Sequence, residues 1–163
     1  MKINKQSHQE KIARCLAAIL ALDEETVQAF CKGNPFDKLI RSFDEHSAEG
    51  KPLYKKEAGR KHYKVSVAAS ASNKPVKELY GEHKIPVSCI IKQLLSSDRS
   101  YDTVLRILLS NEVILTTKEE AHYLDSPVAK GGMGLRMCLP KDGLCRLKAA
   151  NIKIAPETLH NSL

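Results

Sequence analysis

The spacing of apolar residues changes near Tyr63, and this change constrains the fold more than any other feature of the sequence. Before that point apolar residues recur every three or four positions, which is the period of a helix with one buried face. At Tyr63 they begin to alternate with polar residues, as in a strand with one buried face. We therefore expect N-terminal helices over about 7–22, 23–33 and 35–46.

Capping signals mark where several helices should begin. Asp23 can accept hydrogen bonds from the amides of a first turn, and Asn34-Pro35 joins a capping side chain to a proline at the first helical position. Thr117 and Glu120 have the spacing of a capping box. Beyond Tyr63 we expect strands near 63–67, 113–115 and 152–154, and helices near 75–80, 86–95, 100–108, 117–125 and 143–150.

These elements predict a predominantly α-helical α+β fold, with an N-terminal three-helix cluster plus further helices packed with two or three short strands. A chain of 163 residues has the size of one compact domain. We therefore expect a single domain over 1–163, the alternative being a subdomain division near 47–60. Glycine and proline content predicts a flexible loop at 126–143, and residues 156–163 are expected to form a loose tail.

Composition excludes several classes of protein. Hydrophobic residues make up 42% of the chain and charged residues 28%, which is typical of globular proteins rather than disordered or collagen-like ones. The longest apolar run, Cys15–Leu22, is far shorter than the ~20 residues that cross a membrane, and acids follow it directly, unlike in a signal peptide. Five cysteines at irregular spacing favour reduced thiols. We expect a cytoplasmic protein that does not bind membranes.

Positive charge is concentrated in residues 51–64, which we call the basic patch. It contains six lysines and arginines and one acid, a net charge of +5, whereas the whole chain carries +7. Cations bind phosphates, and Tyr54 and Tyr63 could stack on unpaired bases, so the patch is a candidate nucleic-acid contact. The alternative is a solvated lysine-rich loop. The expected contacts are Lys55, Lys56, Arg60, Lys61, His62 and Lys64.

A short helix, a sharp break and a second helix are expected over 76–94. This is the layout of a helix-turn-helix, whose second helix enters the major groove of DNA. Ser88, Lys92 and Gln93 lie on the outer side of the second helix, where they could contact base edges or phosphates. The usual turn glycine is absent if Lys84 occupies the turn, and placing Gly81 there puts Glu82 where an apolar residue belongs. Two ordinary helices joined by a bend are therefore the alternative. A homodimer would extend the short site that one such unit reads.

Signals for catalysis are weaker than those for binding. Glu82-His83-Lys84 has the acid-x-Lys order that metal-dependent nucleases place on a strand, with an upstream acid such as Asp44. The expected helix end at Glu82 does not fit that arrangement. His62, surrounded by cations, is suited to act as a general base on RNA. We assign no catalytic residue from these patterns.

Metal and phosphate motifs are also missing. No cysteine or histidine pair has the close spacing of a zinc site. The glycine-rich stretch Lys130–Gly134 lacks the Gly-Lys-Ser/Thr ending of a phosphate-binding loop, although it could close over a ligand or partner. We therefore expect no metal and no cofactor.

The sequence favours a small basic cytosolic protein that binds DNA or RNA without catalysis. Two alternatives stay open. One is a small nuclease acting on RNA or DNA, with His62, or Glu82 with Lys84, at its centre. The other is a protein-interaction or inhibitor module whose basic surface docks an acidic protein partner.

Overall fold

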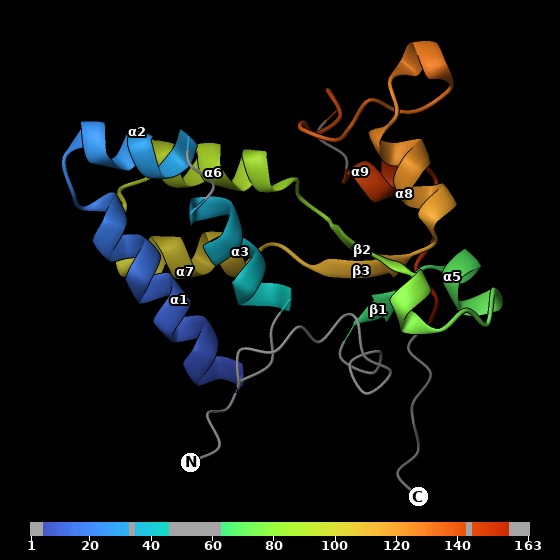
Figure 1. The fold of residues 1–163 in the computed structure, drawn as a ribbon, viewed down its shortest axis with the longest axis horizontal. Coiled ribbons are helices and arrows are strands. Elements are labelled where there is room, and N and C mark those ends of the chain that lie inside the picture. The colour runs from blue at the N-terminus through green and yellow to red at the C-terminus, as the bar shows by residue number, and fades with distance from the viewer. Residues whose placement is uncertain (1–4, 33–34, 46–62, 143–144, 157–163) are drawn as a thin grey trace, which may run out of the picture.

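The computed structural model describes residues 5–32, 35–45, 63–142 and 145–156. Figure 1 shows an elongated molecule with a group of helices at one end and a small sheet with its own helices at the other. The helical end contains α1 (Lys5–Leu20), α2 (Glu24–Lys32), α3 (Pro35–Glu45), α6 (Val87–Ser96) and α7 (Tyr101–Leu109). The sheet end contains β1 (Lys64–Val65), α5 (Val67–Ala71), η1 (Val76–Glu78), β2 (Tyr80–His83), β3 (Val113–Thr116), α8 (Lys118–Asp125), η2 (Val128–Lys130) and α9 (Arg146–Ala149).

One hydrophobic core holds the helical end together. Leu16 and Leu20 of α1 pack in it with Phe36 and Phe43 of α3, and all four side chains are almost fully buried. Leu94 of α6 belongs to the same core, as do residues of α2 and α7. The predicted predominantly α-helical α+β fold is confirmed, and α6 and α7 complete the packing of the N-terminal helices.

The sheet has three strands in the order β1-β3-β2. The central strand β3 runs parallel to β1 and antiparallel to β2, and all four of its residues are buried because neighbours cover both edges and both faces. Its alternate side chains enter different clusters. Ile114 packs with Leu124, Leu135 and Leu147, whereas Leu115 packs with Ala69, Val76 and Leu79.

Two of the predicted caps are confirmed, whereas the cap expected at Asn34 lies outside the described residues. The Thr26 amide donates to Asp23 Oδ1 over 2.9 Å ahead of α2. In the capping box of α8, the Glu120 amide donates to Thr117 Oγ1 over 3.1 Å, and the Thr117 amide donates to Glu120 Oε2 over 2.9 Å. Each contact satisfies an amide that the helix itself leaves without a partner.

The helix expected near 75–80 is largely wrong. Only the three residues of η1 are helical, and Tyr80–His83 form β2. Backbone pairing with β3, from Tyr80 opposite Thr116 to His83 opposite Val113, outweighs the helical spacing of the local apolar residues. The strand expected at 152–154 is reduced to one bridge between Ser66 and Ile154.

Other predictions fall partly or wholly outside the described residues. The division near 47–60 and nearly all of the tail at 156–163 are among these. The expected loop at 126–143 contains η2, and its first half bonds back to α8: the Met133 amide donates to Tyr123 O and the Leu135 amide to Leu124 O, each over 2.8 Å. Among the described helices, none combines the length and the apolar character needed to cross a membrane.

Truncation of Leu16 tests the helical core. Leu16 is fully buried, whereas Leu109 on α7 is 58% exposed and provides a matched control. We expect Leu16→Ala to lower the free energy of unfolding by about 2–5 kcal/mol, because it leaves a cavity. Leu109→Ala should change it by less than about 0.5 kcal/mol. Urea unfolding followed by circular dichroism measures both, and equal effects of the two variants would contradict this core.

Candidate functional site

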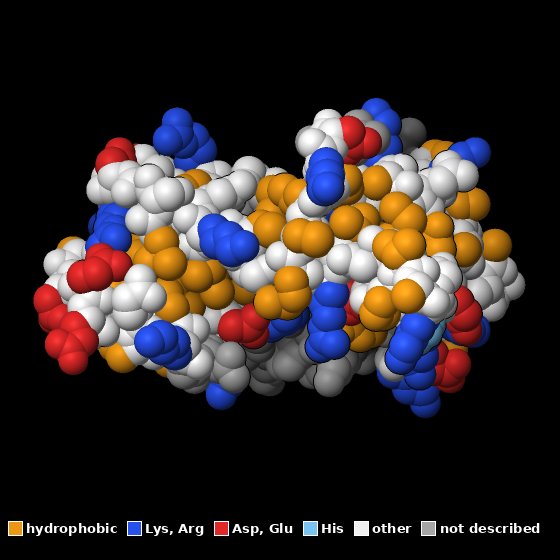
Figure 2. Space-filling model, turned by 90° about the horizontal axis from the view of Figure 1, so that it is seen from above, with side chains coloured by type: hydrophobic (Ala, Val, Ile, Leu, Met, Phe, Trp, Pro, Cys, Tyr) orange, Lys and Arg blue, Asp and Glu red, His pale blue; other side chains and the backbone are white. Residues whose placement is uncertain are grey.

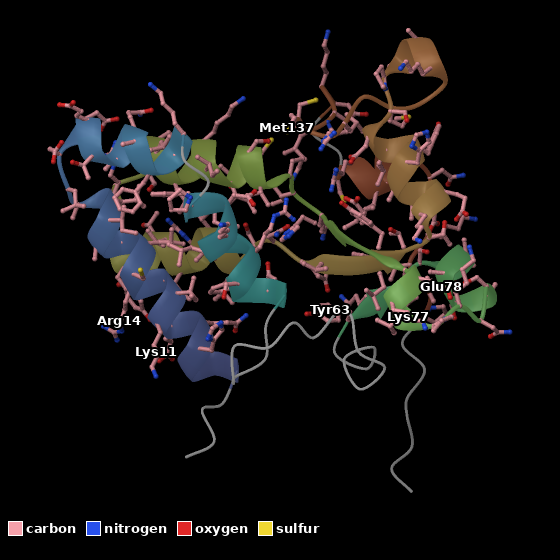
Figure 3. All side chains as sticks on the ribbon, in the orientation of Figure 1. Lys11, Arg14, Tyr63, Lys77, Glu78 and Met137 are labelled. Carbon is pink, nitrogen blue, oxygen red and sulfur yellow. The ribbon has the colours of Figure 1, made fainter. Side chains whose placement is uncertain are left out.

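The basic patch is described only at its C-terminal end. Tyr63 and Lys64 are placed, while Lys55, Lys56, Arg60, Lys61 and His62 lie outside the described residues. The Tyr63 hydroxyl donates to the backbone oxygen of Asp44 over 2.9 Å, and Figure 3 shows Tyr63 near the end of α3. The described residues that flank 46–62 are therefore joined by a hydrogen bond.

Lys64 begins β1 and lies beside an acid. Its Nζ is 2.9 Å from Glu112 Oε1, and both side chains are partly exposed. A salt bridge between partly exposed side chains contributes little to stability and is screened by salt. Lys64 is thus the one described cation among the predicted patch contacts, and its charge is partly balanced by Glu112.

The residues predicted to contact base edges, Ser88, Lys92 and Gln93, lie on α6, but α6 is not part of a helix-turn-helix. The helix-turn-helix predicted for 76–94 is wrong, because β2 occupies the place of its first helix. Ser88 Oγ donates to the backbone oxygen of Met137 over 2.9 Å, so this hydroxyl is used in packing the C-terminal part onto α6. Lys92 and Gln93 remain exposed side by side on α6. The argument for a homodimer rested on the same motif and no longer applies.

The structure brings together a set of polar side chains that sequence reasoning did not connect. We call this set the polar junction, and it lies where the sheet end meets the helical end. Four of its side chains are between 3% and 6% exposed, which is rare for groups of this kind unless they are paired. Its members are Asp44, Glu82, His83, Asn111, Asp125 and Arg146.

Arg146 provides most of the contacts on the sheet side of the junction. Its guanidinium forms a salt bridge with the Glu82 carboxylate, and its Nε donates to the backbone oxygen of His83 over 2.8 Å. Nη1 donates to Leu135 O over 3.3 Å and lies 3.5 Å from Asp125 Oδ1. One side chain of α9 thus holds β2, the loop after η2 and the end of α8.

Asn111 provides the contacts on the helical side. Its Nδ2 lies 2.7 Å from His83 Nδ1 and 3.3 Å from Asp44 Oδ2 at the end of α3. Its Oδ1 accepts from the Ile85 amide over 2.9 Å. An unpaired buried amide would cost about 1–3 kcal/mol, so these contacts specify how β2 and α3 meet.

Burial changes the acidity of Glu82. Desolvation raises the pKa of its carboxyl to about 7 from an ordinary 4.5. The positive charge of Arg146 opposes this shift, but Asp125 shares that charge and adds its own repulsion. The folded protein therefore binds this proton more tightly than the unfolded chain does.

The junction meets one requirement of the nuclease alternative and fails another. Glu82 does lie on a strand, and the Asp44 carboxylate reaches the same cluster through Asn111. However, Glu82 is 3% exposed and bound to Arg146. Within the described ranges, no group of three or more histidine, cysteine, aspartate or glutamate side chains could hold a metal ion.

Comparison with known proteins identifies no relative. No protein-family model, no curated protein and no solved structure matches the chain. The function is therefore inferred from the charges and contacts of its own residues.

The raised pKa of Glu82 predicts how stability depends on pH. The stabilisation from this proton is complete below about pH 4.5 and is lost as pH rises through about 7, because the folded state must then hold a buried carboxylate. As pH rises from 5 to 8, the loss of this stabilisation should lower the free energy of unfolding by about 2 kcal/mol.

Urea unfolding at both pH values measures this effect. In Glu82→Gln the contribution should vanish, whereas Glu25→Gln, at an exposed position on α2, should retain it. An identical pH dependence in the wild type and in Glu82→Gln would contradict the assignment.

Proposed function

We propose that this chain is a small cytosolic protein that binds nucleic acid through the basic patch at residues 51–64. The observation that supports the proposal is the charge of this segment, a net +5 out of +7 for the whole chain. Closely spaced cations release the counterions condensed on a phosphate backbone, which is the main source of affinity in sequence-independent binding.

Hydrogen bonds of the described residues that flank the patch favour nucleic-acid binding over a purely solubilising role. Tyr63 and Asp44 join the flanking chain by a hydrogen bond, and Asn111 connects Asp44 to His83. Cations on a segment held at both ends lose less conformational freedom on binding than cations on a free tail. The polar junction thus anchors Tyr63, at the described C-terminal end of the patch, to α3 and β2.

Lys92 and Gln93 are secondary candidates. They are exposed on α6, and the loss of the helix-turn-helix removes the reason to assign them to a major groove. They remain able to contact phosphates. We therefore assign affinity to Lys55, Lys56, Arg60, Lys61, His62 and Lys64, and no base-specific role to Ser88.

Charge reversal tests the patch. We expect the triple variant Lys55→Glu, Lys56→Glu, Lys61→Glu to weaken binding to every sequence by at least about tenfold, because it removes three phosphate contacts. The plot of the logarithm of the binding constant against the logarithm of the salt concentration should become shallower, its slope changing by about two to three. Fluorescence anisotropy with duplex DNA, single-stranded DNA and hairpin RNA at about 50 and 200 mM salt measures both quantities.

A matched variant separates the patch from net charge. Lys11, Lys38 and Lys77 are exposed lysines on α1, α3 and η1, and Figure 3 shows Lys11 and Lys77 on opposite ends of the molecule. Changing these three to glutamate alters the net charge equally and should weaken binding much less. Equal losses in both triple variants would reject the patch, and no binding by the wild type would reject the function.

A nuclease is the second candidate, favoured by the placement of Glu82 on β2 beside His83, which Asn111 links to Asp44. Cleavage would require Glu82 to leave Arg146. Denaturing gels of the same samples, with Mg²⁺ and with a chelator, distinguish cleavage from binding. Intact substrate under both conditions would reject this candidate.

A further inference from the structure

A shallow groove of about 500 Å³ runs along α8. One side is the helix itself, and the other is the glycine-rich chain that follows it. We call it the α8 groove. Its lining includes Lys118, His122, Tyr123, Ser126, Lys130 and Gly132.

The glycine-rich wall is held tightly against the end of α8. The Gly134 amide donates to Ser126 O over 2.7 Å. A Cβ on Gly132 would lie 2.3 Å from the same oxygen, and Gly131 has a φ of +79°, which other residues rarely adopt. This wall can follow the helix so closely only because these positions are glycines.

The charge of the groove is positive. Among the described residues, Lys118 and Lys130 have no acidic partner, and both are exposed. The one acid of the groove, Glu119, lies 3.5 Å from Lys74 Nζ, so its charge is partly balanced from outside. His122 Nε2 is 3.1 Å from Ser126 Oγ and adds a third polar group. An anionic ligand is complementary to this arrangement.

The groove also offers an aromatic ring and apolar surface. Tyr123 is 43% exposed within it, and Val128 on η2 is 74% exposed beside it. Figure 2 shows hydrophobic side chains gathered over the same end of the molecule, with single cations between them. A ring next to lysines is the combination that single-strand binding proteins use for a base and its phosphate.

We propose that the α8 groove binds one unpaired nucleotide of a nucleic acid, with its base stacked on Tyr123 and its phosphate held by Lys118 and Lys130. This proposal rests on the proposed function. A contact links α8 to the chain that follows the described end of the basic patch: Ser66 Oγ, two residues after Lys64, donates to Glu120 Oε2 in the first turn of α8 over 2.6 Å.

Two matched pairs of variants test the groove in the full chain. Tyr123→Ala is compared with Tyr80→Ala, because Tyr80 is 48% exposed on β2. Lys130→Glu is compared with Lys77→Glu, because Lys77 is exposed on η1. We expect Tyr123→Ala to raise the Kd for single-stranded RNA or DNA by about 5- to 150-fold and Lys130→Glu to reduce the salt dependence. The two controls should retain wild-type binding.

A titration with a mononucleotide makes the groove testable on its own. Amide chemical shifts should change in α8 and residues 130–134 with the mononucleotide, and less with the nucleoside or with inorganic phosphate alone. Equal changes with phosphate alone, undiminished in Tyr123→Ala, would overturn the stacking role. A response only to a phosphorylated peptide would overturn the choice of ligand.

The outcomes for the groove and for the proposed function are distinguishable. Suppose that oligonucleotides bind the wild type, that the basic-patch triple variant binds them more weakly, and that Tyr123→Ala and Tyr80→Ala have equal affinity. The groove is then rejected and the proposed function stands. If no oligonucleotide binds the wild type, the function is rejected, and the absence of mononucleotide shifts in α8 would reject the groove as well.

Discussion

The arrangement of the sheet end depends on the buried contact between Glu82 of β2 and Arg146 of α9. Two ions that leave water cost several kcal/mol each unless their geometry and hydrogen bonds compensate. Arg146 achieves this by also donating to His83 O and Leu135 O. The hydrophobic clusters of the helical end and the sheet end are separate, and Asn111 joins the two ends by contacting His83 of β2 and Asp44 of α3.

The polar junction contacts the described parts of both proposed binding surfaces. Asn111 links His83 to Asp44, and the Asp44 backbone accepts from Tyr63 at the edge of the basic patch. On the opposite side of the sheet end, Asp125 contacts Arg146 from the last turn of α8. The polar junction therefore contacts the described parts of both proposed surfaces through side-chain contacts.

Local signals in the sequence predicted the local parts of the fold. The capping box of Thr117 and Glu120 and the apolar run at 113–115 can be recognised from neighbouring residues, and the helix start and the buried strand that they predict are both confirmed. β2 could not be predicted in this way, because Val76, Leu79 and Tyr80 have helical spacing and only pairing with the distant β3 makes Tyr80–His83 a strand. The same holds for the site: Arg146 and Asn111 acquire their roles from contacts across 64 and 28 residues of chain.

The α8 groove shows how composition can indicate a segment without indicating its structure. Glycine content at 131–134 predicted only a loop, since glycine permits many conformations. This loop forms a wall because Gly132 closely approaches Ser126 O. The backbone amides of Met133 and Gly134 also donate hydrogen bonds to α8 and its C-cap residue. The wall lies at the end of the same helix whose first turn contacts Ser66, two residues after Lys64. Lys64 at the described end of the basic patch is thus connected through α8 to Lys118 and Lys130 of the groove, and this connection is the physical reason to propose that one nucleic acid contacts both.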